Sequence, residues 1–293
     1  MNQDSKIRAR YFLLSFTLAF ALISAFFFFL INVVHPRAPV VPEPRIIDED
    51  DPWRPDKEDA LTVLFMGNGS RRDPPGIYIL ARFAPDQEKV FLTVLPPRTL
   101  VQNQGSIEPM DEVYAYGGPS YTLNCLADTL GMAIDRYVRM DVRSFAAAAA
   151  AVGTVEFELE EPLEIKQGGY QFRLEKGLQL LDGRKIAQLF QWDGYKEESE
   201  RYRIIASISA AIVEQRRDIA ASTVTDKIFE RIINLVDTDI SYVDYAVRKA
   251  SGEYLANLNG PVVEIIDVSG AFGEKETYAL SDTFSARLAM EYG

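Results

Sequence analysis

The sequence predicts an α/β domain, with helices layered on both faces of a mixed central sheet, preceded by one transmembrane helix. Two observations predict the domain. From residue 61 onward, short apolar runs of strand length alternate with longer segments of helical periodicity, and some neighbouring runs are separated only by turns short enough for hairpins. The third observation is a long uncharged run near the N-terminus, which predicts the membrane helix.

Residues 11–34 carry no charge, and this run exceeds the roughly 20 residues that cross a bilayer core. Lys6, Arg8 and Arg10 precede it, and positive flanks stay cytoplasmic. We therefore expect a cytoplasmic tail at residues 1–10, an anchor at 11–34, and a single-pass protein of the cell membrane whose main domain is extracellular. The alternative is a cleaved signal peptide, which the length of the run and the lack of a clear small-x-small cleavage site disfavour.

Residues 35–60 are rich in proline and acidic residues, which predicts an extended, solvated stalk before a domain at 61–293. The formal net charge of −12 excludes non-specific nucleic-acid binding, which needs a basic surface, so no nucleic-acid partner is expected. The single cysteine, Cys125, excludes an intramolecular disulfide, and the single histidine, His35, precedes the domain. Histidine-dependent nucleophilic catalysis and ordinary zinc sites are therefore excluded within the domain.

The first half of the domain begins with three apolar strands, at 61–66, 76–83 and 89–95, the last two joined by a hairpin turn of sequence APDQE. Residues 120–131 have helical spacing and end in glycine, and residues 134–140 alternate like a half-buried strand. The alanine run 146–151 predicts a buried helix with small side chains for close packing. Asp141 and Ser144 stand before it as caps and Gly153 follows it.

The second half is mainly helical. A strand is expected at 154–160, and the next residues predict a hairpin that turns at Gly168 and Gly169. Helical periodicity then predicts helices at 182–191, 197–217, 222–236 and 241–255, followed by a strand at 261–268 and a last helix at 281–291.

The stretch LFMGNGSRRDPPGIYIL, residues 64–80, is the first candidate for chemistry. Glycines after a strand let the backbone approach a ligand, and Arg71 and Arg72 carry forked donors suited to phosphate oxygens. Asp73 follows them. The alternative is an ordinary strand-end turn with solvated arginines, because short glycine motifs occur often by chance.

Two further arginines stand at positions that suit an anion site. Arg98 follows Pro96 and Pro97 at the end of a strand, where open α/β sheets usually place ligands, although it could equally be a surface arginine after a turn. Arg201 lies on the apolar, inward face of the helix at 197–217, one turn before Ile205. An inward arginine needs an anionic partner, which is either a carboxylate of the protein or a phosphate of a substrate.

These segments occur in the order seen in the LytR-CpsA-Psr family of bacterial envelope proteins, also described as carrying a cell envelope-related transcriptional attenuator domain, and the chain resembles that family over residues 61–291. The pieces that carry the resemblance are LFMGNGSRR, IYILARFAPDQEKVFLTVLPPR, DEVYAYGG, IDRYVRMDVRSF, VGTVEFEL, GLQLLDGRKIAQLF, ESERYRIIASISAAI and DTDIS. The resemblance implies one external domain that holds a polyprenyl diphosphate-linked glycopolymer, with the lipid in an apolar cavity among helices. Family enzymes transfer the polymer to peptidoglycan.

The resemblance also implies which residues act. Arg71, Arg98 and Arg201 match the family's phosphate-binding arginines, and Arg72 and Asp73 are secondary candidates. The family holds Mg²⁺ with aspartates, so Mg²⁺ is possible by resemblance. The expected ligands are missing, however, because Gly69, Pro75 and Thr99 stand where the motifs have aspartate, and Asp73 is off register.

Other positions depart as well. Gln191 and Asp193 stand where arginines are expected, and Ile204 and Ile205 replace an Arg-Gln pair. Two hypotheses follow. The chain is a divergent glycopolymer transferase, or it is a catalytically inactive scaffold or regulator of envelope assembly that binds a lipid or a partner. The sequence assigns no catalytic residue and no metal ligand.

Overall fold

The computed structural model describes residues 53–68, 73–167 and 169–292. The chain divides into two compact units, Met1–Trp53 and Arg54–Gly293, and the helices and strands below belong to the second. The expected tail, the anchor at 11–34 and most of the stalk lie outside the described residues, as do Arg71 and Arg72. Among the described helices, none combines the length and the apolar character needed to cross a membrane.

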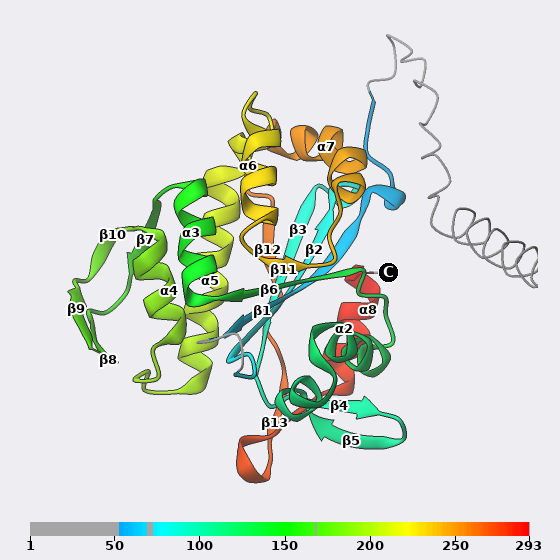
Figure 1. Ribbon diagram of the computed structural model, residues 1–293, viewed down its shortest axis with the longest axis vertical. Helices are drawn as coiled ribbons and strands as arrows, with labels where there is room; N and C mark the ends of the chain where they lie inside the picture. Colours follow the sequence, from blue (N-terminus) through cyan, green and yellow to red (C-terminus); the bar gives the residue numbers. More distant parts are fainter. Residues whose placement is uncertain (1–52, 69–72, 168, 293) are drawn as a thin grey trace, which may run out of the picture. The chain divides into compact units, whose positions relative to one another are not determined.

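The core of the second unit is a six-stranded sheet in the order β11-β6-β1-β2-β3-β12 (Figure 1). Its strands are β1 (Leu61–Asn68), β2 (Ile77–Ala84), β3 (Lys89–Leu95), β6 (Arg136–Asp141), β11 (Asp237–Thr238) and β12 (Val263–Ile265). β1, β2 and β3 form an antiparallel meander, whereas β6 runs parallel to β1 and β12 runs parallel to β3. The predicted mixed sheet is therefore confirmed.

Helices cover both faces of this sheet because successive strand residues point to opposite sides. Leu64, Met66 and Leu80 face one apolar core, against α2 (Met110–Leu130) and α8 (Asp282–Tyr292). Ile77 and Ile79 face the second core. That side carries α3 (Val142–Val152), α4 (Gly183–Gln191), α5 (Glu198–Arg216) and α6 (Thr225–Ile233), as Figure 1 shows. The remaining long helix, α7 (Tyr242–Ala256), contacts the short 3₁₀ turns at residues 57–59, 85–87 and 217–219.

Four two-stranded sheets surround the core: β4 (Leu100–Asn103) with β5 (Ser106–Pro109), β7 (Val155–Leu159) with β10 (Gly177–Leu181), β8 (Leu163–Gln167) with β9 (Tyr170–Leu174), and β13 (Gly270–Phe272) with β14 (Tyr278–Leu280). The β8–β9 hairpin was predicted, and Gly169 adopts the left-handed φ of 88° in its turn. The β4–β5 and β13–β14 hairpins and the strand β10 were not predicted.

Helix α2 begins ten residues before the predicted start at 120, since it runs from Met110. Gly118, with φ 70° and ψ −167°, bends it, and Pro119 then opens the second segment, where a missing N–H costs nothing. Gly117 is required beside this bend, because a Cβ there would lie 2.4 Å from the Tyr121 ring. The predicted helix is the second segment, and it ends at Gly131 in the left-handed conformation as expected.

The alanine helix α3 begins as predicted. The Ser144 N–H donates to Asp141 Oδ1 at 2.8 Å, and Gly153 follows its last turn. Its alanines pack closely on α4, since a Cβ at Gly183 would lie 2.7 Å from the Ala146 carbonyl oxygen. The predicted helix is less buried than expected, because Ala148 is the one buried residue in the run 146–151. Part of α3 borders a cavity instead of packed side chains.

Candidate functional site

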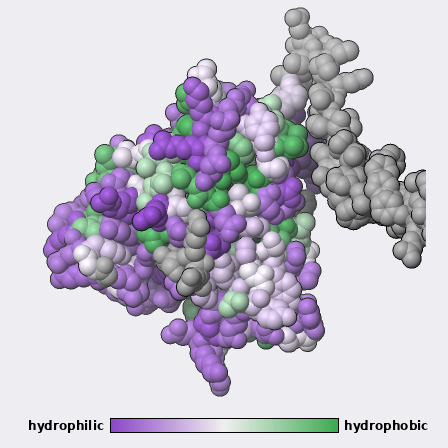
Figure 2. All heavy atoms as spheres, viewed as in Figure 1, coloured by the Kyte–Doolittle hydropathy of each residue, from purple (hydrophilic) through white to green (hydrophobic). Residues whose placement is uncertain are grey.

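A wholly apolar cavity of about 320 Å³ lies between the sheet and helices α3, α4, α5 and α6. Figure 2 shows apolar residues gathered on the visible face beside α3 and below α6, where the cavity's cover reaches the surface. No charged side chain is among its lining residues, which are Phe65, Val138, Met140, Phe145, Ala148, Ala149, Val152, Gly153, Val155, Ile186, Ile212, Phe229, Ile232, Ile233, Val236 and Ile240.

The sheet supplies the floor of this cavity through cross-strand neighbours. Phe65 on β1 pairs with Val138 on β6 and with Ile79 on β2, so their side chains share one face. Ala148 and Ala149 on α3 are too small to fill the space above that floor, which is why a void remains.

Helix α6 covers the cavity from the other side. Its apolar residues Ile228, Phe229, Ile232 and Ile233 are only half-buried, and Thr225 is its one buried residue. No side chain caps the N-terminus of α6. A helix with so little buried apolar area is held less firmly than its neighbours.

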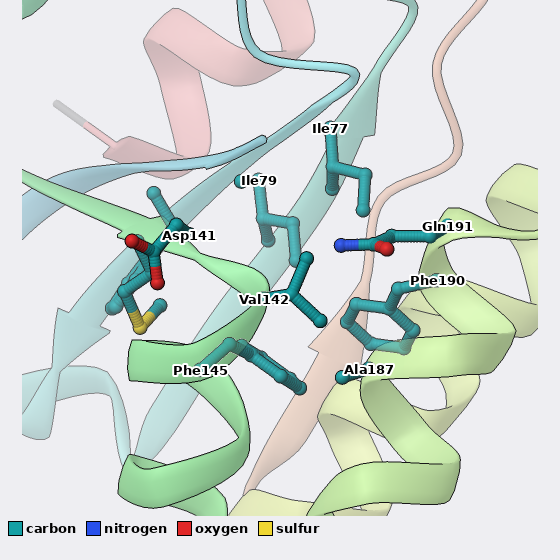
Figure 3. Close-up of a pocket in the computed structure, with 11 residues that line it drawn as sticks. Ile77, Ile79, Asp141, Val142, Phe145, Ala187, Phe190 and Gln191 are labelled. Carbon is teal, nitrogen blue, oxygen red and sulfur yellow. The ribbon is translucent and has the colours of Figure 1, made fainter. Parts of the chain in front are cut away.

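A second, smaller pocket of about 40 Å³, called the neck below, adjoins the cavity near the ends of β1, β2 and β6. The neck shares Phe65, Met140 and Phe145 with the cavity, and its other lining residues include Ile77, Asp141 and Gln191. Figure 3 shows the Gln191 amide reaching across the neck toward Ile77 and Val142, with Asp141 on the far side. Polar groups thus occur at the neck and not in the cavity.

The Arg201 guanidinium lies beside this neck. Its Nη2 donates to the carbonyl oxygens of Gly76 and Phe190, both at 3.2 Å, and the adjacent Ile77 and Phe190 itself line the neck. The side chain is 14% exposed. Among the described residues its carboxylate contact is with Glu198, at 3.7 Å; this contact is long and its partner is half-exposed, so it neutralises little of the charge.

Arg201 also keeps unused hydrogen-bonding capacity. Its buried Nε has no partner within the described part of the chain. Because neutral carbonyls hold most of this guanidinium, its charge is little compensated by the protein and is available to an anion that enters the neck. Arg201 thus lies beside the neck, and its contact with a phosphate stays a prediction from the sequence.

Arg98 is held differently. Its Nη1 lies 2.5 Å from Asp111 and its Nη2 lies 2.9 Å from Glu112, both at the start of α2, while Nε donates to the Lys275 carbonyl at 3.0 Å. The hydrogen bond to Glu112, together with the nearby Asp111 charge, raises the pKa of Arg98. Arg98 lines neither the cavity nor the neck. A phosphate contact by Arg98 remains a prediction, and its ion pairs would have to open for it to form.

The other expected positions divide between core and surface. Ile204 and Ile205 lie on the buried face of α5, and the buried Thr99 hydroxyl donates a hydrogen bond to the Pro96 carbonyl at 2.7 Å. Asp73 and Asp193 are exposed.

The described residues do not form a magnesium site by themselves. Nowhere in the described ranges do three or more Asp, Glu, His or Cys side chains gather in a way that could hold a metal. Asp141 is the one carboxylate that lines the neck, and it accepts the cap hydrogen bond of α3. Mg²⁺ binding by this chain therefore stays a prediction from the resemblance.

The residues that line the cavity were not predicted individually from the sequence. Two signals could have pointed to them. Alternate residues of three neighbouring strands are large and apolar, which marks one sheet face, and the facing helix carries a run of alanines too short to fill the space.

The profile of the LytR_cpsA_psr family matches residues 42–277. The chain belongs to this family. A curated relative is the polyisoprenyl-teichoic acid–peptidoglycan teichoic acid transferase TagU of Halalkalibacterium halodurans, which is 23% identical over 62% of this chain and 62% of its own length. The chain thus spans less than two thirds of that relative.

Solved structures of the family share the fold. The structure of TagV of B. subtilis has a TM-score of 0.68 at 19% identity, over 81% of this chain and 97% of that one. The structure of TagT bound to LI-WTA has a TM-score of 0.63 at 16% identity, over 82% of this chain and 90% of that one. At these identities the likeness concerns the fold alone, and it confirms the α/β layering.

Proposed function

We propose that this chain is a membrane-anchored extracellular protein of cell-wall assembly that binds a polyprenyl diphosphate-linked glycopolymer and transfers the polymer to peptidoglycan. The observation that carries the proposal is the wholly apolar cavity, whose neck leads to the Arg201 guanidinium. The name of the TagU relative, a polyisoprenyl-teichoic acid–peptidoglycan transferase, supports the substrate class.

The cavity suits a hydrocarbon chain and no polar ligand. The lining residues that the structure describes offer no hydrogen-bonding side chain, so a polar group placed there would lose its bonds to water without replacement. An apolar chain would gain about 0.8 kcal/mol for each CH₂ it buries. The volume of about 320 Å³ accommodates part of a long polyprenyl tail, and the remainder would extend under α6.

The neck suits the diphosphate at the head of that tail. A tail seated between Phe65 and Phe145 would bring its first phosphate to the strand ends, next to Gly76 and Arg201. A guanidinium binds phosphate oxygens through parallel N–H···O bonds, which are among the stronger hydrogen bonds in proteins. The Gln191 amide offers a further donor on the same side.

The proposed reaction is a displacement at phosphorus. A hydroxyl oxygen of the acceptor glycan bonds to the phosphorus that carries the polymer, and the bond from that phosphorus to the bridging oxygen breaks. The carrier leaves as polyprenyl monophosphate, and the hydroxyl proton passes to solvent. In this reaction the chain's residues hold the tail away from water and orient the diphosphate, and Arg201 offsets the negative charge that grows on the leaving group.

The alternative, a non-catalytic lipid-binding scaffold, is favoured by one specific observation. The Arg98 side chain, expected on the diphosphate, is taken up by Asp111, Glu112 and the Lys275 carbonyl. Arg201 is then the one candidate arginine beside the neck within the described residues. Thr99 also stands where the family motif has an aspartate, so a metal ligand is missing as well.

The two functions are separated by measuring binding and turnover in the same preparation. Purified full-length chain would be titrated with undecaprenyl diphosphate, and then incubated with a lipid-linked glycopolymer and peptidoglycan, with and without Mg²⁺. Binding with release of polyprenyl monophosphate supports the transferase. Lipid binding without release of polyprenyl monophosphate supports the non-catalytic scaffold. Absence of lipid binding overturns both proposed functions. Arg201→Ala should weaken diphosphate binding, while Arg203→Ala, on another face of α5, should not.

A further inference from the structure

A second concave surface lies on another face of α5, outside the cavity and its neck. This groove has a volume of about 270 Å³ and runs between the start of α5, the segment after β12 and the β13–β14 hairpin. The residues that matter to the argument are Ser199, Tyr202, Arg203, Asp267, Phe272 and Tyr278. Its size is near the lower end of the roughly 300–1,000 Å³ of ligand pockets, which suits a single ring-sized ligand.

Aromatic side chains form two walls of the groove. Phe272 is 55% exposed, which is unusual for a large apolar side chain, and its ring packs edge-on against Tyr278 with centroids 4.8 Å apart. Tyr278 is buried, so it holds the Phe272 ring in place. Tyr202 contributes from α5, and burial, with a hydrogen bond to Glu198, raises its pKa and keeps the phenol neutral.

Polar side chains of both kinds stand among these rings. Asp267 is exposed and offers acceptors, Arg203 is exposed and offers donors, and Ser199 adds a hydroxyl. Arg203 contacts Glu160 at 3.3 Å, an exposed pair that competes only weakly with a ligand. A groove that presents flat apolar rings beside both donors and acceptors matches a sugar, which has apolar C–H faces and a rim of hydroxyls.

The charges around the groove argue for an uncharged sugar. The opposite charges of Asp267 and Arg203 offset each other in the groove. A further negative charge, that of Glu276 on the hairpin, lies close enough to Tyr202 to help raise its pKa. The chain as a whole carries a formal charge of −12. A polymer rich in phosphate would be repelled here, because no excess of positive charge offsets its own.

The hairpin that carries Phe272 is fixed to the rest of the domain through Arg98. The Tyr278 N–H donates to the Arg98 carbonyl at 2.9 Å, and Arg98 Nε donates to the Lys275 carbonyl at 3.0 Å. The guanidinium of Arg98 is in turn fixed by Asp111 and Glu112 on α2. In the structure as it stands, Arg98 is therefore a positioning residue for one wall of the groove.

We propose that this groove binds an uncharged sugar ring, and that this ring belongs to the acceptor glycan of the transfer reaction. The second half of the proposal rests on the proposed function. The first turns of α5 carry both sites: Arg201 points to the neck, while Ser199 and Tyr202 line the groove. Since an α-helix with its side chains is about 10–12 Å across, the groove and the diphosphate would lie on two sides of one helix.

The test is saccharide binding by the full-length chain, with an uncharged N-acetylglucosamine tetramer as the probe and a polyol-phosphate oligomer as the charged comparison. We expect the tetramer to bind and the polyol-phosphate oligomer to bind more weakly. Phe272→Ala should weaken tetramer binding at least tenfold. Tyr116→Ala is the matched control, because Tyr116 is an aromatic residue, 79% exposed, that does not line the groove, and it should leave binding unchanged.

Three results would overturn the sugar site: no binding of the tetramer, equal binding by Phe272→Ala, or tighter binding of the charged oligomer. Binding of undecaprenyl diphosphate is measured separately on each variant. If Phe272→Ala loses the tetramer and keeps the lipid, the groove is distinct from the lipid site. If the tetramer binds but the lipid does not, the proposed function fails while the sugar site stands. Arg98→Ala should likewise reduce tetramer binding, because the hairpin loses its anchor.

Discussion

Filling the apolar cavity should weaken lipid binding strongly without unfolding the domain. Ala148 is the position of choice, because it is buried on α3 and its side chain borders the void. In Ala148→Phe the new ring would enter a space of about 320 Å³ that no other side chain occupies among the described residues. Ala150, exposed on the same helix, gives the matched control Ala150→Phe.

The magnitudes follow from the size of the ring. A buried phenylalanine side chain gains about 1.5–3 kcal/mol by leaving water, so Ala148→Phe should be as stable as the parent or slightly more stable. The ring would displace about seven carbons of a bound tail, worth about 6 kcal/mol at about 0.8 kcal/mol for each CH₂. Since the tail can shift in part, we expect a loss of about 3 kcal/mol, or more than a hundredfold in affinity.

The assay is titration of both variants with undecaprenyl diphosphate, accompanied by thermal unfolding. Ala150→Phe should bind like the parent chain. If folded Ala148→Phe binds the lipid as tightly as the parent, the cavity is not where the tail sits. If instead the variant unfolds at a much lower temperature, the ring has met packed atoms and the space above the sheet is not open.

Three further predictions concern single residues. Arg201→Ala should weaken binding of a polyprenyl diphosphate about tenfold or more, because a charged hydrogen bond is worth about 1.5–3 kcal/mol, while binding of the matching uncharged prenol should not change. Burial alone would raise the pKa of Asp244, but hydrogen bonds from Arg136 and Ser241 outweigh it and lower that pKa. The stabilisation of the folded state by the Asp244–Arg136 ion pair is therefore complete above the pKa of an unfolded aspartate, about 3.9. It is lost as the pH falls through the lower pKa that Asp244 has in the folded state. Asp244→Asn should lower the free energy of unfolding by about 2 kcal/mol at pH 7, which is less than the loss of a fully buried pair because Arg136 is partly exposed. Thermal unfolding should show that the difference between variant and parent disappears in acid. Gly183→Ala should lower the free energy of unfolding by about 1–3 kcal/mol, because its Cβ would meet the Ala146 carbonyl oxygen at 2.7 Å. The variant should therefore melt at a lower temperature, and an unchanged melting curve would contradict the close contact of α3 and α4.

The sheet could be predicted from the sequence because the strands of its meander are short, nearly continuous apolar runs and the next strand alternates between polar and apolar residues. The start of α2 could not, since Gly117, Gly118 and Pro119 together suggest a break, and the helix merely bends there. Because the start of α2 was predicted too late in the chain, the ion-pair partners of Arg98 were not predicted either. Asp111 and Glu112 lie in the first turn of α2, a turn the sequence analysis did not place.

Only the chemical character of the candidate site could be predicted from the sequence, and its shape could not. Arg201 could be assigned an inward direction from helical spacing, and the structure places it between the Gly76 and Phe190 carbonyls. The cavity itself arises where alanines of α3 fall opposite Phe65, and that pairing depends on how separate elements meet. Local periodicity carries no information about a void between elements. The same holds for the groove, whose walls come from α5 and from a hairpin near the C-terminus.

The most direct test is a crystal structure of the chain with a short polyprenyl diphosphate, such as geranylgeranyl diphosphate. We predict that the tail lies between Phe145 and Phe229, over Phe65, and that a phosphate oxygen is within hydrogen-bonding distance of the Arg201 guanidinium. A tail bound elsewhere, or a diphosphate seated away from Arg201 with the cavity unfilled, would contradict the proposed lipid site.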